Sequence, residues 1–334
     1  MIITHEEVNE IVDAVLARAR VPQDNATLQR DLLVEAELRG VASHGLLRLP
    51  RVVDRIANGV ADPVTKGKHS WTNAAFLSVD GEKGLGPVVA VSALEKISER
   101  ARDHGIAVAA ISNSNHLGML AFYAERIAAS GQTLIAFSTS EALVHPWGGR
   151  KALVGTNPVA IGVPTETGPF VVDTATSIVS MGEIHDRAQR GIAIPADWAL
   201  DEAGNPTTDP VAAINGSLAP FGAAKGYALG LAFELLVSNL AGSALGTDVK
   251  GTLDSTEQCN KGDLFIVIDG PSTALAPYLE QIRNAEPADG FEHVRVPGEG
   301  GRACRDARLH NGIPVDGKLW TRLLELAASP LCEA

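Results

Sequence analysis

The spacing of apolar residues changes once along the chain, and this change restricts the fold more than any other feature. Apolar side chains recur at three-and-four spacing over residues 6–39, with a break at Val21-Pro22, and again over 46–56 up to Asn58-Gly59. Because of Pro50, this third helix is expected to start on either side of that residue. After a connector at 62–68, short β-rich runs alternate with helical patterns. The sequence therefore predicts an α/β body that follows a largely helical N-terminal part.

The elements of the body follow from these patterns. Strands are expected at 75–79, 106–112, 133–138, 159–163, 170–173 and 264–269, and helices at 88–101, 120–129, 177–190, 225–240, 274–285 and 318–328. The segment 194–219 is long, polar and turn-rich, with breakers at Asn205-Pro206 and Asp209-Pro210. A loop of this length predicts either a functional segment or a structural wrap.

The charge balance argues against two classes of partner. The chain of 334 residues has a formal net charge of -12 and no polybasic run beside an apolar stretch. Nucleic acid and anionic membranes are therefore not expected as partners. An anionic substrate would need arginine or lysine placed locally.

The sequence also predicts a cytoplasmic protein. Residues 1–15 are acidic and amphipathic, unlike a signal peptide. The most apolar stretch, Gly226 to Gly246, carries Glu234, which suits a packed core helix better than a membrane span. Three cysteines lie far apart without a CxxC pair, so neither a zinc cage nor a disulfide framework is indicated; they are Cys259, Cys304 and Cys332.

The glycine fingerprint of a Rossmann dinucleotide site is not met. Its nearest match, Gly84-Leu85-Gly86-Pro87-Val88-Val89, has valine at the third glycine position and a proline that removes a backbone donor. We interpret residues 84–87 as a turn before a helix. Phosphate-loop, zinc-protease, nucleophile-elbow and EF-hand motifs are absent from the sequence as well.

A first candidate site lies at Ala42 to Arg48. Four-residue spacing predicts His44 and Arg48 on one helix face, with Ser43 as the N-cap. Arg48 is suited to a carboxylate, and His44 to giving a proton to a carbonyl oxygen. A capped surface helix with an incidental histidine and arginine explains the pattern equally well.

A second candidate site is the polar run from Ile111 to Gly118, between a strand and a helix, where ligand loops tend to lie. Its His116 suits a neutral hydrogen-bonding role, but an ordinary Ser/Asn-rich connection explains the run too. Residues 155–158 and 173–177 suit ribose or nicotinamide, or simple turns and caps. Lys225 at a helix head and the glycine-rich loop 297–302 each suit a phosphate.

Seven stretches in this order resemble the malate/L-lactate dehydrogenase family that lacks a Rossmann fold. They span Leu38 to Glu299 and read LRGVASHGLLRLP, SNSNHLG, GTNPVAIGVP, VVDTATS, IPADWALDEAGNPTTDP, AKGYALGLAFELL and VPGE. The family also includes ureidoglycolate dehydrogenase, diketogulonate reductase, sulfolactate dehydrogenase and piperideine-2-carboxylate reductase.

The resemblance implies an α/β fold around a mixed, largely antiparallel sheet, with a helical domain built from both chain ends. Residues 1–70 with 300–334 would form the helical substrate and dimerisation part, and 71–299 the part that binds a nicotinamide cofactor. A homodimer with its active site between domains is expected.

The resemblance also implies roles for single residues. His44, Ser43 and Arg48 look like the substrate and proton-transfer set, with His116 as a second acid/base candidate, and Thr156 looks like a substrate contact. No metal ligand is implied. The cofactor contacts implied are His116, Leu117, Gly118, Met119, Leu120, Ser140, Glu141, Asp173, Thr174, Ala175, Lys225, Gly226, Pro297, Gly298 and Glu299.

The function implied is hydride transfer between NAD(P)(H) and a small 2-hydroxy/2-oxo acid such as malate, lactate or ureidoglycolate. A carboxylate from Glu141 beside the adenosine ribose would repel a 2'-phosphate, which favours NAD over NADP. Reduction of a cyclic 2-imino acid is the first alternative. A non-redox lyase with a metal, or a small-molecule binding protein, is more distant.

Overall fold

The body of the molecule is built on one seven-stranded sheet, in a computed structural model that describes residues 1–328. The strand order is β2-β3-β4-β12-β5-β8-β9, and only the β3–β4 pair is parallel. The prediction of a mixed, largely antiparallel sheet is therefore confirmed. The strands are β2 (Lys68–Trp71), β3 (Phe76–Asp80), β4 (Ile106–Ser112), β5 (Thr133–Ser138), β8 (Val159–Val163), β9 (Phe170–Thr174) and β12 (Gly262–Ile268).

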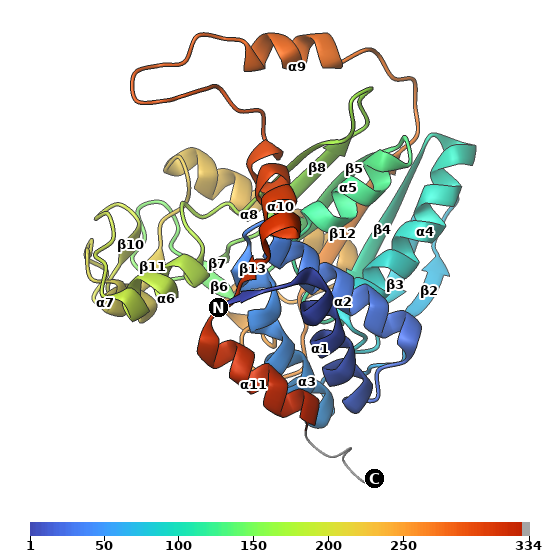
Figure 1. Ribbon diagram of the computed structural model, residues 1–334. Coiled ribbons are helices and arrows are strands. Elements are labelled where there is room, and N and C mark those ends of the chain that lie inside the picture. The colour runs from blue at the N-terminus through green and yellow to red at the C-terminus, as the bar shows by residue number, and fades with distance from the viewer. Residues whose placement is uncertain (329–334) are drawn as a thin grey trace.

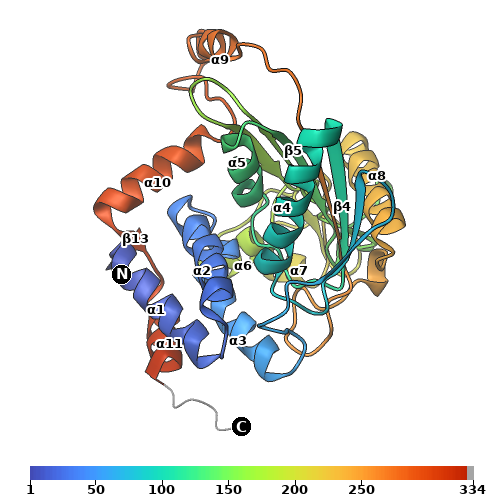
Figure 2. The same ribbon diagram turned by 90° about the vertical axis from the view of Figure 1, so that its right-hand side faces the viewer.

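Helices cover both faces of this sheet (Figure 2). On one face α4 (Gly86–His104) packs on Ala107, Ala109 and Ile111, and α5 (Ala121–Ala129) covers β5, β8 and β9. On the other face α8 (Ala224–Ala241) packs beside Val108 and Ala110. The alternation of side chains along β4 thus serves two cores, which is why this strand is apolar from Ile106 to Ile111.

Both ends of the chain build one helical part (Figure 1). Its two short strands pair antiparallel, and Val8 and Val12 share a core with Trp320 and Leu323. The helical start and the break at Val21-Pro22 are confirmed, whereas the domain boundaries at 70 and 300 stay predictions. The elements are β1 (Ile2–Ile3), α1 (His5–Arg18), α2 (Gln23–Leu38), α3 (Leu49–Ala57), α10 (Glu299–Asn311), β13 (Ile313–Pro314) and α11 (Gly317–Ala328).

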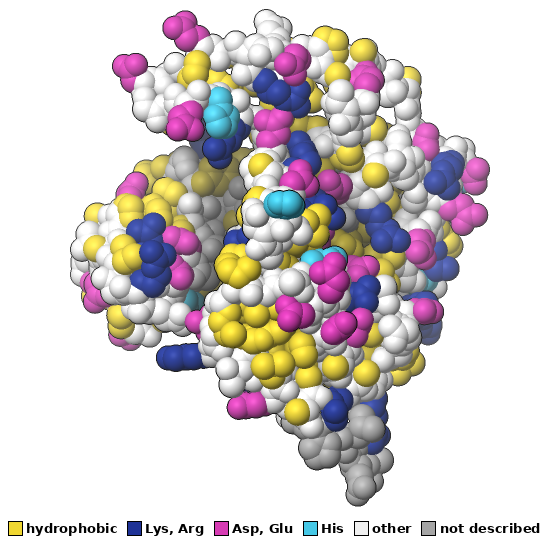
Figure 3. Space-filling model, viewed as in Figure 1, with side chains coloured by type: hydrophobic (Ala, Val, Ile, Leu, Met, Phe, Trp, Pro, Cys, Tyr) yellow, Lys and Arg dark blue, Asp and Glu magenta, His cyan; other side chains and the backbone are white. Residues whose placement is uncertain are grey.

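The turn-rich segment 194–219 is a structural wrap. It packs Ile194, Ala213 and Leu218 against Val144 and forms a small lobe beside the main body. Figure 3 shows a hollow between this lobe and α10. The lobe comprises β6 (Ala142–Val144), β7 (Val154–Gly155), α6 (Met181–Arg190), β10 (Ala199–Leu200), α7 (Pro210–Ile214) and β11 (Ser217–Leu218).

Two predicted elements need correction. The helix expected from residue 177 begins at Met181, because Ser177 pairs with Pro220 and Ser180 caps the helix instead. The glycine-rich loop expected at 297–302 is the start of α10, with Gly298 in the left-handed region at the N-cap. Glycine is a poor helix former, and packing of α10 on α2 overrides that preference.

Other predictions concern the chain as a whole. Within residues 1–328 no helix is long and apolar enough to cross a membrane. Cys259 and Cys304 are free thiols, and Cys332 lies outside the described residues. The segment around α9 (Ala276–Arg283) extends away from the body as an arm (Figure 1).

Candidate active site

A cleft of about 500 Å³ runs between the small lobe, the edge of the main sheet and the helical part. It brings together three predicted groups that are far apart in the sequence, contributed by the α2–α3 connection, the β4–α5 loop and the end of β9. Most predicted site residues line it: Ser43, His44, Arg48, His116, Leu117, Gly118, Met119, Leu120, Ser140, Thr156, Asp173, Thr174, Ala175, Pro297 and Gly298.

Four predicted cofactor residues lie outside this cleft. The Glu141 carboxylate accepts hydrogen bonds from the backbone N–H groups of Thr252 and Leu253, at 2.8 and 2.9 Å. Glu299 is bonded to Arg283 and to the backbone of the α9–α10 connection. The other two, Lys225 and Gly226, stand at the head of α8. The geometry of the single chain does not support these four contacts.

The loop that carries His44 is not the predicted helix. It forms two short 3-10 turns on either side of Gly45, and α3 begins only at Leu49. Pro50 has no N–H to continue a helix from the preceding turn, so it is tolerated only in the first turn of α3. Ser43 is therefore not a helix N-cap, and the prediction that His44 and Arg48 share one helix face is wrong.

The 3-10 turns nevertheless place these side chains together. The Ser43 hydroxyl lies 2.9 Å from Nδ1 of His44, and Nε of Arg48 donates to the Ser43 carbonyl at 2.8 Å. Burial and the Arg48 charge lower the pKa of His44 to about 4. His44 is therefore neutral near pH 7, hydrogen-bonded to the serine hydroxyl, and is able to act as a proton acceptor.

Glu37 positions this loop, although no sequence pattern pointed to it. Its buried carboxylate accepts from the backbone N–H of Leu46 at 2.8 Å. A Cβ on Gly45 would lie only 2.4 Å from the same carboxylate, so the close approach requires glycine. Burial raises the pKa of Glu37.

The His116 loop is fixed by its own polar residues. Asn115 donates to the carbonyls of Lys83 and Gly84 and accepts from Nε of Arg55 at 2.7 Å. A Cβ on Gly86 would lie 2.2 Å from the His116 carbonyl oxygen. The incomplete glycine fingerprint is thus the predicted turn before a helix, and Gly86 lets α4 approach the His116 loop.

The protonation of His116 follows from its partner. The backbone N–H of Gly118 donates to Nδ1 of His116 at 3.0 Å, so the proton of the neutral ring lies on Nε2. Burial, together with the charges of Arg48 and His44, lowers the pKa of His116 well below its ordinary value. The two histidine rings are 5.4 Å apart, centroid to centroid. His116 is therefore a fixed neutral donor.

The Ser140–Thr156 wall depends on a buried glutamate of α8. The Ser140 hydroxyl accepts from the backbone N–H of Thr156 at 2.9 Å. Next to it, Asn157 donates to Glu234 at 2.7 Å, and Glu234 also accepts from the backbone of Gly155 at 3.0 Å. Glu234, expected to mark a core helix, holds the loop that carries Thr156.

Lys261 is a cleft residue that the sequence did not single out. It is buried, lines the cleft, and its ammonium is bonded to both carboxylate oxygens of Asp263. Ser138 donates to the same carboxylate at 2.6 Å. A Lys-x-Asp pair at the start of a strand is no motif by itself, so only the fold reveals this ion pair.

Asp173, near the end of β9, lines the cleft and caps the start of α5. Its carboxylate accepts from the backbone N–H of Ala121 at 2.7 Å. Desolvation in the cleft raises the pKa of Asp173 to about 6. Within residues 1–328, no group of three or more His, Cys, Asp and Glu side chains is arranged to hold a metal ion.

A model of the malate/L-lactate dehydrogenase family matches residues 3–324 of the chain. The chain belongs to this family. L-sulfolactate dehydrogenase of Methanocaldococcus jannaschii is 35% identical, covering 98% of this chain and 96% of that protein. The (2R)-3-sulfolactate dehydrogenase (NADP(+)) of Chromohalobacter salexigens is 36% identical over 92% of both chains. A solved dehydrogenase from Sinorhizobium meliloti is 52% identical, with a TM-score of 0.95 and 98% coverage of both chains.

This malate/L-lactate dehydrogenase family member is accordingly an enzyme of the oxidoreductase class. The family and the fold predicted from the seven sequence stretches are confirmed.

Proposed function

We propose that the enzyme transfers a hydride between a nicotinamide dinucleotide and a small 2-hydroxy/2-oxo acid in this cleft. One observation carries the proposal: an arginine with a free guanidinium nitrogen and two neutral histidines face one end of a large cleft. In Arg48, Nη1 is buried without a hydrogen-bond partner. An anionic group with two acceptor oxygens satisfies such a guanidinium best.

The residues of the cleft fit a nicotinamide dinucleotide. A volume of about 500 Å³ is typical of cofactor sites. Pro297 and Gly298 line the cleft where α10 begins, and a helix N-terminus attracts a pyrophosphate. The cofactor supplies a hydride acceptor or donor carbon, and the chain supplies binding, orientation and proton transfer.

Within this proposal the two histidines have different tasks. His116 donates a hydrogen bond from Nε2–H to the carbonyl oxygen of the 2-oxo acid and holds it in place. Protonation of His116 at Nδ1 would break its bond from Gly118, so proton transfer is assigned to His44, which contacts the Ser43 hydroxyl. Neutral His44 takes the proton of the 2-hydroxyl when the hydroxy acid is oxidised, and its protonated form returns a proton to the carbonyl oxygen in reduction. A neutral histidine donor beside a separate proton-transfer group is a known arrangement in enzymes.

We propose NAD as the preferred cofactor, on grounds other than Glu141. Among the described residues that line the cleft, three are cationic, and two of them are paired: Arg39 with Glu35, and Lys261 with Asp263. The third, Arg48, stands at the histidine end. NADP sites usually provide an unpaired cation for the 2'-phosphate, and none of the described residues that line the cleft is left for this role.

The cyclic imino acid alternative is less compatible with this charge distribution. A protonated imine carries a positive charge, and Arg48 already lowers the pKa of both histidines. A second cation at this place would be repelled. A carbonyl substrate meets no such penalty.

We also infer a homodimer, for which α8 gives support. The helix is apolar on nearly all sides, and its outer face exposes leucines at 36 to 52% of their full area: Leu229, Leu235, Leu236 and Leu240. An exposed apolar face of this kind is typical of an interface. Light scattering of the purified enzyme measures the mass directly, and a monomer would contradict the inference. The cytoplasmic location stays a prediction.

The proposed activity is tested by following the nicotinamide absorbance during reduction of a panel of 2-oxo acids with NADH and with NADPH. Consumption of the reduced cofactor that depends on a 2-oxo acid, with a higher kcat/KM for NADH, is the expected result. His116→Asn should reduce kcat/KM, and Glu95→Gln on the exposed side of α4 serves as the matched control. Binding of neither cofactor would overturn the proposal.

A further inference from the structure

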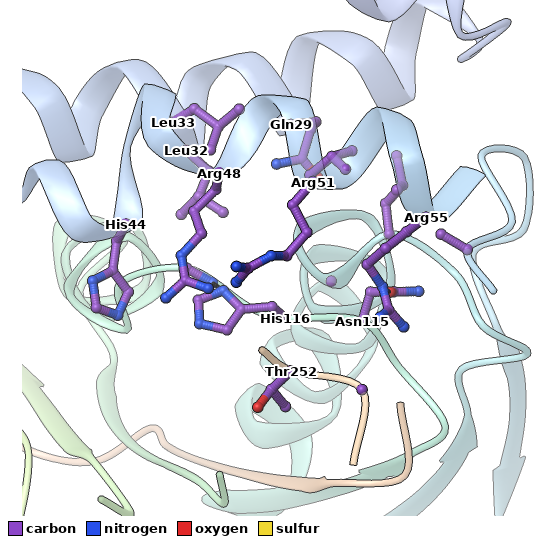
Figure 4. A pocket seen from close by; sticks show the side chains of 16 residues that line it. Gln29, Leu32, Leu33, His44, Arg48, Arg51, Arg55, Asn115, His116 and Thr252 are labelled. Atoms are coloured by element: carbon purple, nitrogen blue, oxygen red, sulfur yellow. Dashed lines mark hydrogen bonds between the residues drawn. The ribbon is translucent and has the colours of Figure 1, made fainter. Parts of the chain in front are cut away.

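Three arginines of the segment from Arg48 to Arg55 line one small space next to His116. Figure 4 shows Arg48 and Arg51 near His116 and Arg55 turned toward Asn115. Arg55 is fully engaged: it donates to Asn115 at 2.7 Å and to the carbonyls of Asp254 and Glu257 at 2.8 and 3.0 Å. Arg48 is engaged only through Nε. Arg55 is therefore structural, and Arg48 is open to a ligand.

Arg51, to which no sequence pattern pointed, lies between Arg48 and Arg55. Figure 4 shows its guanidinium beside that of Arg48 and above His116. Within residues 1–328 no hydrogen bond and no ion pair holds the Arg51 side chain. A guanidinium that lies close to another cation, without a carboxylate between them, is electrostatically unfavourable.

The surroundings of Arg51 lack a compensating anion. The space is lined by apolar and neutral side chains besides the arginines and histidines, and no carboxylate lines it. Two carboxylates whose charges act on Arg55 are already bonded: Glu141 accepts from the backbone N–H groups of residues 252 and 253, and Asp254 accepts from those of Thr256 and Glu257. Burial and the Arg51 charge together lower the pKa of Arg48 to about 10.

The size of the space limits what can enter it. Its volume is about 40 Å³, which is room for about three atoms of water size. A carboxylate or sulfonate group fits such a space, whereas a ring or a phosphorylated chain does not. The space opens into the cofactor cleft, because His44, Arg48, His116 and Thr252 line both.

The geometry points to a substrate with two acidic groups: Arg48 binds the carboxylate next to the carbonyl, and Arg51 binds a second carboxylate or sulfonate on the neighbouring carbon. This inference rests on the proposed function and narrows its substrate class to dianionic 2-oxo acids and their 2-hydroxy forms. Arg51 is then the residue that separates them from monocarboxylates. Two negative charges offset the two neighbouring guanidinium groups, where a monoanion offsets only one.

The kinetic test compares pyruvate with oxaloacetate and sulfopyruvate, at saturating NADH, for wild-type enzyme and Arg51→Gln. Wild type should prefer the dianions, and Arg51→Gln should lower kcat/KM for them by about 10- to 100-fold, the loss typical of a charged hydrogen bond. Activity on pyruvate should change by less than about threefold, since pyruvate does not reach Arg51. Arg51→Lys should keep part of the preference, because it keeps the charge.

Arg102→Gln, at an exposed position near the end of α4, is the matched control for loss of one positive charge. It should leave all three substrates unchanged. If wild type uses pyruvate as well as oxaloacetate, or if Arg51→Gln lowers both alike, the inference is overturned while the proposed function stands.

A binding measurement separates failure of the inference from failure of the proposed function. Calorimetry of the enzyme with malonate and with acetate needs no turnover. Wild type should bind malonate more tightly, and Arg51→Gln should lose about tenfold or more for malonate alone. Equal binding of the two acids by wild type would overturn the inference, whatever the redox assays show.

Discussion

Glu37, Gly86 and Asn115 hold the two loops that carry His44 and His116. Gly86 shows this most clearly, because any side chain there would meet the backbone of His116. In the sequence Gly86 belongs to an incomplete dinucleotide-binding fingerprint, and the residue pattern correctly assigned it to a turn before a helix. Its structural role is to let α4 approach His116, which lies far along the chain from Gly86, and spacing alone does not reveal that contact.

Gly86→Ala should displace His116 and lower kcat strongly, by about tenfold or more, because small shifts of a catalytic group are costly. The free energy of unfolding should also fall by about 1 to 3 kcal/mol through overpacking. Gly270→Ala is the matched control, since a Cβ there meets nothing within 4 Å. Kinetics and urea unfolding of both variants measure the two effects. Unchanged kcat in Gly86→Ala would contradict this role.

Arg48→Lys tests the carboxylate contact at the same scale. Lysine keeps the charge but loses the two-pronged geometry of the guanidinium. We expect kcat/KM for the 2-oxo acid to fall about 10- to 100-fold while the dissociation constant of NADH stays within about twofold. Fluorescence titration with NADH provides the second value. If kcat and KM both stay at wild-type values, Arg48 does not bind the carboxylate.

His44 gives a pH prediction with a defined sign. Its pKa is about 4 in the folded enzyme, against an ordinary value of 6.5, so the unfolded chain binds more protons between these values. The free energy of unfolding should therefore fall as pH drops from about 6.5 to 4, by at most about 1.4 kcal/mol per pH unit from this residue. His44→Gln removes this contribution. Urea unfolding of both proteins at several pH values tests it, and parallel curves would contradict it.

At the scale of elements, the sequence predicted the strands and most helices because their apolar period is strong. It failed where a single residue or tertiary packing decides. Pro50 delays α3 and replaces a helix by two 3-10 turns. Gly300 and Gly301 look like a loop, yet α10 forms there because it packs on α2. Both failures changed the surroundings of predicted site residues.

The start of β12 carries the buried ion pair of Lys261 and Asp263. Lys261→Met should lower the free energy of unfolding by about 3 to 5 kcal/mol, because it leaves a buried carboxylate uncompensated. The double variant Lys261→Met/Asp263→Leu should regain most of that loss, since an apolar pair of similar size avoids the uncompensated charge. Urea denaturation of the three proteins measures this. A double variant no more stable than Lys261→Met would contradict the account.

On the scale of the whole molecule, the active cleft is assembled from segments that come from the helical part, the main sheet, the small lobe and the start of α10. The sequence identified most of these segments through family resemblance. It did not show that Arg51 lies beside Arg48 near His116 or that the Glu141 carboxylate is taken up by the backbone of Thr252 and Leu253. Such facts depend on side-chain direction in the folded chain, which no local pattern encodes.

The central claim is that this cleft carries a hydride between a nicotinamide and carbon 2 of a 2-oxo acid. The most direct test incubates the enzyme with oxaloacetate and NADH deuterated at carbon 4, in separate samples for the two faces of the ring, and examines the product by NMR. We predict that one of the two samples gives a 2-hydroxy acid with deuterium at carbon 2. Oxidation of NADH without deuterium at carbon 2 in either sample would contradict the account.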